Sequence, residues 1–252
     1  MHDESTGWLS LHPGELYLIW TELGLGELPA VLEIPHVGRT ASARAELVEL
    51  ADRALAERGL GTVARPARDL ADLLRALAAP ELSLDLEVTG DGTVFRGAGA
   101  SGAYGDVAAG AGDGEVRLGP VRRTALVETM LTSVSPLQAG IGGPGNIRFA
   151  DYRRACRVAE YEGSTGFLDV LRDAGVRAAE ANTLLRAVSG PSGSGRFGAS
   201  ARASGRAPST VNWVDTEHGR YALRRHGDWV TVTPVDPARL LTMAQEMASD
   251  LA

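Results

Sequence analysis

The segment Leu73-Leu74-Arg75-Ala76-Leu77-Ala78-Ala79-Pro80 closes a helix-like run, and a similar segment, Leu184-Leu185-Arg186-Ala187-Val188-Ser189-Gly190-Pro191, follows at an offset of 111 residues (184 − 73). Strand-like sequence punctuated by glycine comes after each copy. Each strand region closes on a related signature before another helix-like run, Val116–Val121 in the first case and Val230–Val235 in the second. Similar segments at a fixed offset indicate an internal repeat. Two copies predict a pseudo-two-fold arrangement of two halves rather than a solenoid.

The chain between the two copies is rich in glycine and proline over residues 135–146. Such a stretch between periodic segments is typical of a linker. The length of 252 residues is ample for one large core. We therefore expect a single domain, 1–252, made of an N-terminal half (1–134), this linker, and a C-terminal half (147–252).

Strands and helices come in groups. Residues 82–89 alternate apolar and polar side chains, which predicts a strand with one buried face. Asp91-Gly92 then gives a strong hairpin signal. The second half repeats the pattern, with expected strands at 193–203, 211–215, 220–224 and 228–233 before a last helix at 236–250. Hairpin-connected strands between groups of helices predict an α+β fold, with a central, mostly antiparallel β-sheet flanked by helical bundles.

Residues 97–114 are dominated by glycine and alanine. Gly97–Gly102 matches the pattern G-x-G-x-x-G, but more glycine follows where a dinucleotide site needs a helix. We interpret this segment as a flexible hairpin loop with weak strand character at 103–108, and not as a nucleotide site.

Composition excludes several classes of function. All 25 basic residues are arginine, so a P-loop lysine or a Schiff-base lysine is excluded. The net charge of −7 disfavours a nucleic-acid binder. Cys156 is the sole cysteine, which excludes an intrachain disulfide and a multi-cysteine metal site. Met1–Glu4 is acidic and no long apolar run is present, so we expect a cytoplasmic protein with no cofactor and no membrane insertion.

The sequence leaves the roles of two groups of residues undecided. His218 and His226 flank an expected hairpin, and with Asp215 they form the best candidate for a cryptic catalytic or metal site. Trp213 and Tyr221 are expected to share one face of the last strands. That face either packs in the core or receives a partner, because Trp, Tyr and Arg are the residues that anchor interfaces.

The order of several segments resembles the EspG family, the chaperones associated with ESX (type VII) secretion in actinobacteria. The resemblance extends over nearly the whole chain and is carried by Leu23–Pro29, Gly38-Arg39-Thr40 at the start of an Ala/Arg-rich helix, Leu82–Val88, Val214–Tyr221 and Gly227–Pro234.

The resemblance implies a pseudo-two-fold α+β fold and a non-enzymatic role. Family members bind a specific secretion substrate in the cytosol, namely a PE–PPE heterodimer held at the apolar tip of a helical hairpin. Covering that tip would keep the client soluble and competent for export. The regions it points to are 97–114, 213–229 and 236–250. Our candidate partner-binding residues are Arg96, Tyr104, Trp213, Arg220, Tyr221, Trp229, Leu240, Met243 and Met247.

One departure from the family pattern leaves the client open. Residues 97–114 offer few anchoring side chains beyond Tyr104, so a WXG-type helical hairpin is an alternative client. A self-associating scaffold, with a homodimer in the absence of client, is the other alternative to the chaperone role.

Overall fold

The computed structural model describes residues 7–251, so the expectation for Met1–Glu4 lies outside the described residues. The middle of its sheet is the antiparallel pair of β2 (Leu82–Gly90) and β7 (Gly193–Ala201). Leu86 lies opposite Phe197 in this pair. These two positions differ by 111 (197 − 86), the offset of the sequence repeat. Leu86 and Phe197 therefore occupy equivalent positions in the two halves, and the pseudo-two-fold axis passes between them.

The strand order reads the same from both edges of the sheet. The order is β1-β5-β4-β3-β2-β7-β9-β10-β11-β6, with β8 paired to β7 as the eleventh strand, and the pairs are antiparallel. In both halves hairpins lead outward from the axis, and the edge strand is the one that precedes the half's first helix. The remaining strands are β1 (Leu9–Leu11), β3 (Thr93–Gly102), β4 (Gly105–Gly112), β5 (Glu115–Pro120), β6 (Gly145–Arg148), β8 (Gly205–Arg206), β9 (Val211–Thr216), β10 (Gly219–His226) and β11 (Trp229–Pro234).

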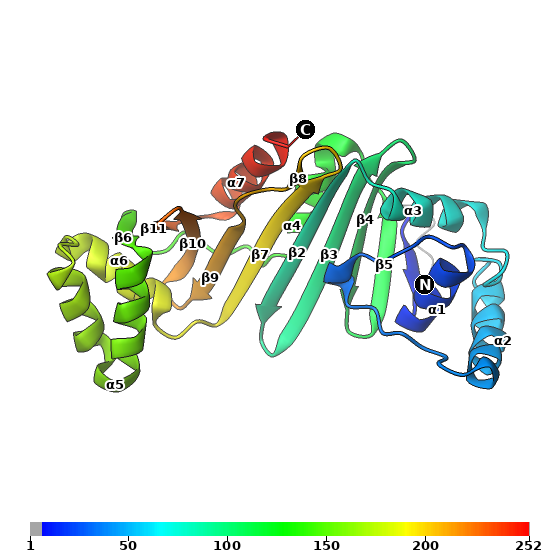
Figure 1. The fold of residues 1–252 in the computed structure, drawn as a ribbon, viewed down its shortest axis with the longest axis horizontal. Helices are drawn as coiled ribbons and strands as arrows, with labels where there is room; N and C mark the ends of the chain where they lie inside the picture. The colour runs from blue at the N-terminus through cyan, green and yellow to red at the C-terminus, as the bar shows by residue number, and fades with distance from the viewer. Residues whose placement is uncertain (1–6, 252) are drawn as a thin grey trace.

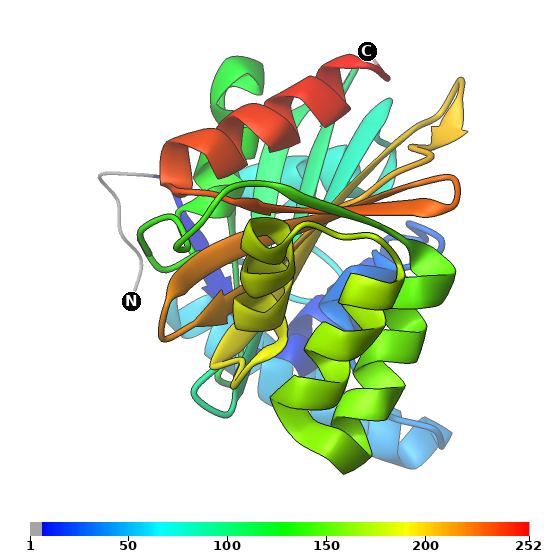
Figure 2. The ribbon, with the colours of Figure 1, turned by 90° about the vertical axis from the view of Figure 1, so that its left-hand side faces the viewer.

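The helices cover the sheet unevenly (Figure 1). At one end α1, α2 and α3 form one layer, and at the other end α5 and α6 hang from the same face. Helices α4 and α7 lie on the opposite face near the middle, as Figure 2 shows for α7. Their bounds are α1 (Pro13–Glu22), α2 (Ala41–Glu57), α3 (Arg68–Ala78), α4 (Leu126–Leu131), α5 (Phe149–Asp173), α6 (Ala178–Val188) and α7 (Pro237–Ser249), with 3₁₀ turns η1 (Ala30–Leu32) and η2 (Arg123–Ala125).

Side-chain alternation explains this layering. Leu84 and Leu86 of β2 point to the face covered by α4 and α7, where they are buried with Phe197 and Leu240. Ala98 and the other alternate residues of β3 and β4 pack under α3 on the other face. The predicted α+β fold with its antiparallel sheet and flanking helices is therefore confirmed. No helix among residues 7–251 is both long and apolar enough to cross a bilayer.

The expected flexible loop at 97–114 is wrong. These residues belong to β3 and β4, two regular strands inside the sheet, and only their turns are irregular. Large neighbours replace the missing side chains: Phe95 lies where a Cβ of Gly110 would be, and Met130 lies against Gly99. The low strand propensity of glycine is thus overcome by packing, and no loop remains here to become ordered on binding.

The linker is bonded to the sheet. The amide of Gly140 donates to the carbonyl of Arg220 at 2.9 Å, and the amide of Arg220 donates to the carbonyl of Gln138 at 2.9 Å. Residues 145–146 already begin β6. The exact boundaries of the two halves stay a prediction.

Candidate functional site

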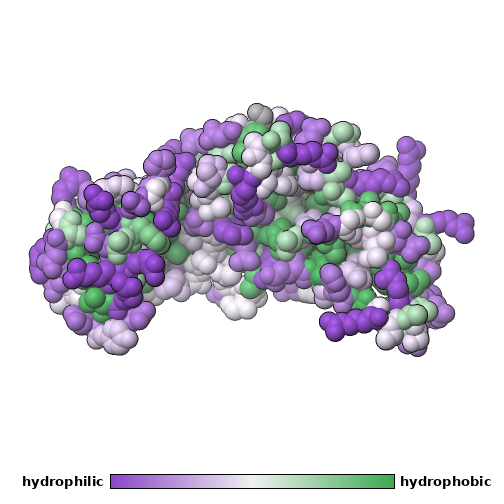
Figure 3. Space-filling view, in the orientation of Figure 1, coloured by the Kyte–Doolittle hydropathy of each residue, from purple (hydrophilic) through white to green (hydrophobic). Residues whose placement is uncertain are grey.

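The sheet has an open region between its two helical layers. Within residues 7–251, no α-helix is seated over β2 and β7 on the face that carries α3 and α6 (Figure 1). The space-filling view shows an arched molecule hollowed between its two ends (Figure 3). We call this surface the central saddle. Its polar side chains are Ser83, Asp85, Glu87 and Thr89 of β2, Arg96 of β3, Ser194 and Arg196 of β7, Arg206 of β8 and Asn212 of β9.

Strand register places opposite charges side by side on the saddle. Glu87 is paired with Arg96 on one side and with Arg196 on the other. Arg96 reaches Glu87 at 3.6 Å and Glu33, at the end of η1, at 2.8 Å. Its buried Nε has no hydrogen-bond partner within the described part of the chain. This arginine therefore joins η1 to the floor of the saddle.

A second group of charges centres on Asp85. Both oxygens of this carboxylate accept hydrogen bonds from Arg206, one of them at 2.9 Å, and Arg196 lies 3.7 Å away. The arginine side chains are about half exposed, at 44% and 54%. Ion pairs this exposed add little stability. Their main effect is to hold the charged groups in place at the surface.

Two hollows adjoin these charges. One of about 490 Å³ lies between η1, the end of α3 and strand β2, and is lined by Pro29, Val31 and Ala78 as well as by the charged groups. The other, of about 250 Å³, lies above β7 and β9 beside Asn212. The saddle is thus an uneven, mostly polar surface with apolar patches on its wall.

Only Arg96, of the nine candidate residues, lies on the saddle. Trp213 and Tyr221 do not share a face, because the register pairs Trp213 with Ala222 and Tyr221 with Val214. Both are buried, Trp213 against Gly195 on the side of α7 and Tyr221 under the linker. Burial raises the pKa of Tyr221, whose hydroxyl donates to the carbonyl of Ile141 at 3.2 Å. The burial of both rings supports core packing over direct contact with a partner.

The other candidates are scattered. Arg220 is buried in an ion pair with Asp215, and Leu240 and Met247 are buried between α7 and the sheet. Met243 is half-buried on the same helix. Two side chains are exposed, Tyr104 in the turn between β3 and β4 and Trp229 at the far edge of the sheet. These residues form no single surface.

The alternative site near His218 is also wrong in its geometry. His218 lies in the turn before β10 and His226 is the last residue of that strand. A strand of this length separates its ends by roughly 25 Å. Asp215 is occupied by Arg220. No group of three or more His, Cys, Asp or Glu side chains suited to a metal ion occurs in residues 7–251.

The saddle residues that our sequence analysis missed are chiefly Asp85, Glu87, Arg196 and Arg206. The alternation in β2 already marks Asp85 and Glu87 as one polar face. Arg196 stands at the repeat offset from Asp85 (196 − 85 = 111). The repeat offset is therefore the sequence signal that relates these positions of β2 and β7.

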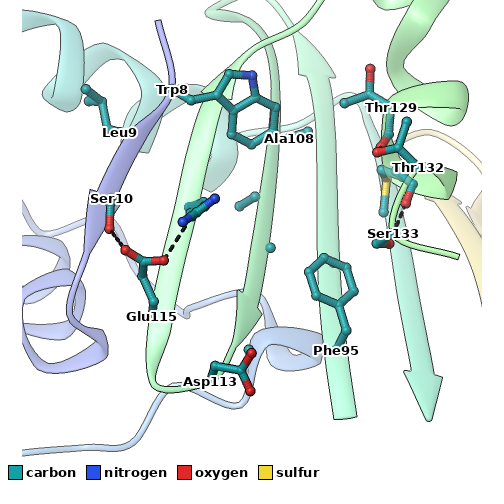
Figure 4. Close-up of a pocket in the computed structure, with 16 residues that line it drawn as sticks. Trp8, Leu9, Ser10, Phe95, Ala108, Asp113, Glu115, Thr129, Thr132 and Ser133 are labelled. Carbon is teal, nitrogen blue, oxygen red and sulfur yellow. Dashed lines mark hydrogen bonds and ion pairs between the residues drawn. The ribbon is translucent and has the colours of Figure 1, made fainter. Parts of the chain in front are cut away.

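A further hollow, of about 1000 Å³, lies on the opposite face between the edge strand β1 and α4 (Figure 4). Trp8 and Phe95 rise over its glycine-rich floor. Glu115 on its wall accepts hydrogen bonds from Ser10 and, at 2.9 Å, from Arg117. These two donors hold the pKa of Glu115 below its ordinary value. Glu115 is therefore neutralised by residues of its own and the neighbouring strand.

Comparison with known proteins decides the family. The sequence model of the EspG family matches residues 12–246. The chain belongs to the EspG family. A similar solved structure is the Mycobacterium tuberculosis type VII secretion system chaperone EspG5 in complex with a PE25–PPE41 dimer, with a TM-score of 0.77, 18% sequence identity and 97% of each chain covered. At this identity the likeness shows a shared fold. No curated protein sequence matches the chain.

Proposed function

We propose that this member of the EspG family is a cytoplasmic chaperone of type VII (ESX) secretion, and that its central saddle binds the end of a helical-hairpin client. The client is PE/PPE-like or WXG-type, and binding uses neither nucleotide nor metal and involves no catalysis. The observation that carries the proposal is the open saddle between two helical layers, on a fold shared with a chaperone that was solved with a PE25–PPE41 dimer.

The dimensions of the saddle fit such a client. Its floor consists of β3, β2, β7 and β9, and four strands about 4.8 Å apart span roughly 15–20 Å with their side chains. Two packed helices with axes about 8–10 Å apart are roughly 20 Å across. The end of one hairpin therefore covers the floor between the two helical layers.

The charges of the floor specify the tip of the client further. A purely apolar tip would remove Asp85, Glu87 and their arginines from water without replacing the lost hydrogen bonds, which is costly. We expect the tip to bring hydrogen-bonding groups to these charges and apolar groups to the hollow beside Val31 and Ala78.

Affinity purification from the cytosol of the host, with mass spectrometry, identifies the client. The purified complex is then tested with Arg196→Glu, which places a negative charge between Glu87 and Asp85 on the floor. We expect at least about tenfold weaker binding by calorimetry, as for close charge pairs at other interfaces. Arg123→Glu, at an exposed arginine in η2 outside the saddle, is the matched control.

If Arg196→Glu binds the client as tightly as the wild type does, the saddle is not the client-binding surface. A preparation that recovers only the chain itself, with a dimer mass in light scattering, would favour the self-associating scaffold instead.

A further inference from the structure

Arginines and aromatic rings gather at the C-terminal edge of the sheet, where β10 and β11 turn and β6 leads into α5. We call this surface the cationic edge. Its members are Arg148, Phe149, Arg153, Arg224, Arg225, His226 and Trp229.

The strand register aligns three of these side chains in a row. His226 lies opposite Trp229, and Trp229 lies opposite Arg148 on β6. The guanidinium of Arg148 is 5.1 Å from the centroid of the Trp229 ring. Trp229 is nevertheless 47% exposed, while Trp20 and Trp213 are buried. An aromatic ring of this size is therefore presented to solvent beside a cation.

A second ring gathers the cations on the other side of the strands. Arg225 lies 4.0 Å and Arg153 5.8 Å from the centroid of Phe149. The amide of Phe149 donates to the carbonyl of Asp228 at 2.7 Å, which joins the start of α5 to the turn between β10 and β11. The two aromatic residues are thus held at the same end of the strands, one on each side.

The arginines of this edge are not neutralised. Within residues 7–251, none of Arg148, Arg153, Arg224 and Arg225 has a carboxylate oxygen within 4.0 Å. The acidic groups nearest in sequence are Asp151 and Asp228, which leave an excess of positive charge. Stacking on a ring orients a guanidinium and keeps its other N–H groups available to an anion. In Arg225 the Nε–H donates to the carbonyl of Gly227 at 3.0 Å, so its terminal N–H groups would meet the anion. In a chain of net charge −7, this local excess is a distinct surface.

We propose that the cationic edge is a docking surface for an acidic segment of a partner protein, separate from the central saddle. Arginine pairs with carboxylates through two parallel hydrogen bonds, and exposed Trp beside Arg is the composition of an interface anchor. Among the strands of residues 7–251, β6 pairs only with β11, so the backbone groups on its other side can bind an extended polypeptide. The negative net charge disfavours a nucleic acid at the same place.

Fluorescence anisotropy at low ionic strength tests the proposal. The probe is a short labelled peptide of alternating Glu and Ser, and the same peptide with Gln in place of Glu is its control. We expect the Glu peptide to bind and to change the emission of Trp229. The double variant Arg148→Glu/Arg225→Glu should lose at least about tenfold in affinity. Trp229→Phe should remove the emission change.

Matched variants locate the effect. Arg122→Glu/Arg123→Glu makes the same change of charge at exposed arginines elsewhere and should bind the peptide like wild type. Arg148→Gln/Arg225→Gln, which adds no negative charge, should also weaken binding and serves if the reversed variant does not fold. Equal binding of the Glu and Gln peptides, or no loss in either double variant, would overturn the proposal. Tighter binding of an oligouridylate through the same arginines would assign the edge to nucleic acid and overturn it as well.

The proposal does not depend on the client. Arg196→Glu on the saddle should leave peptide binding unchanged, and the variants of the cationic edge should leave the client complex intact. The two proposals therefore fail separately.

Discussion

Each half of the molecule contains an arginine–carboxylate pair that ties distant segments together, but the two pairs lie at different depths. In the N-terminal half Arg58, the residue after α2, bonds Glu15 at 2.6 Å and the carbonyls of Ser10 and Ala54 at 2.7 and 2.9 Å, with 30% of its side chain exposed. In the C-terminal half Arg220 bonds Asp215 at 2.6 and 2.8 Å and the carbonyl of Ser135 at 2.9 Å, with 1% exposed.

The two halves share one fold, but this does not fix how deeply their arginine–carboxylate pairs are buried. Water can reach Arg58 if Glu15 is removed, because 30% of the arginine side chain is exposed, whereas Arg220, 1% exposed, would stay buried without its carboxylate. Removing one member of a fully buried pair costs more than the pair itself contributes, because an uncompensated charge remains. The two halves therefore should respond differently to the same substitution.

The largest effect should come from Asp215→Asn. We expect it to lower the free energy of unfolding by about 3–5 kcal/mol, because the buried Arg220 loses its carboxylate. Glu15→Gln, the matched change in the other half, should cost about 1–3 kcal/mol, because Arg58 remains partly exposed. Urea denaturation followed by circular dichroism measures both. The double variant Arg220→Met/Asp215→Asn should recover part of the loss, and equal costs for the two carboxylate substitutions would contradict the difference in depth between the arginines.

A smaller effect is expected where each half seats a tryptophan on a glycine. A Cβ at Gly195 would overlap the ring of Trp213, and one at Gly119 would overlap Trp8. Trp213 is buried and has no room to move, so Gly195→Ala should cost about 1–3 kcal/mol. Trp8 is half-buried and can shift, so Gly119→Ala should cost less than about 1 kcal/mol. Thermal melts compare the two, and a larger cost at Gly119 would refute this account.

The smallest effect concerns Glu115 near the N-terminal edge of the sheet. Its charge is neutralised by its neighbours, whereas the arginines of the cationic edge in the other half are not neutralised. The pKa of Glu115 in the folded chain is below the ordinary value of 4.5, chiefly because Ser10 and then Arg117 donate to it. The resulting stabilisation is complete above the ordinary pKa and is lost as the pH falls through the folded value. Ser10→Ala should raise the pKa toward 4.5, as measured by NMR titration. An unchanged pKa would rule out the hydroxyl as its main cause.

The repeat was the part of the fold that sequence revealed best. Its offset alone relates Leu86 to Phe197 across the axis, and the alternation of β2 identified a buried and a polar face. The strands at 97–114 were hidden, because glycine and alanine carry little strand propensity and the side chains that cover them lie outside this segment, Phe95 near the start of β3 and Met130 in α4.

The candidate site was harder to predict, because it depends on register. The two-residue turn between β9 and β10 pairs each odd-numbered residue of one strand with an even-numbered residue of the other. Trp213 and Tyr221, both odd, therefore lie on opposite faces, although their spacing suggested one. The charges of the saddle meet only when β2 pairs with β7, which no local pattern in either strand specifies.

That central pair also has a consequence for synthesis of the chain. Strand β2 is made well before its neighbour β7, whose matching residues follow 111 positions later. At translation rates of about 5–20 residues per second, the nascent chain holds one edge of β2 without its neighbour for roughly 6–22 s. During this interval the edge strand of the emerging half is open to pairing with other chains, so the protein is most vulnerable to aggregation before its second half leaves the ribosome.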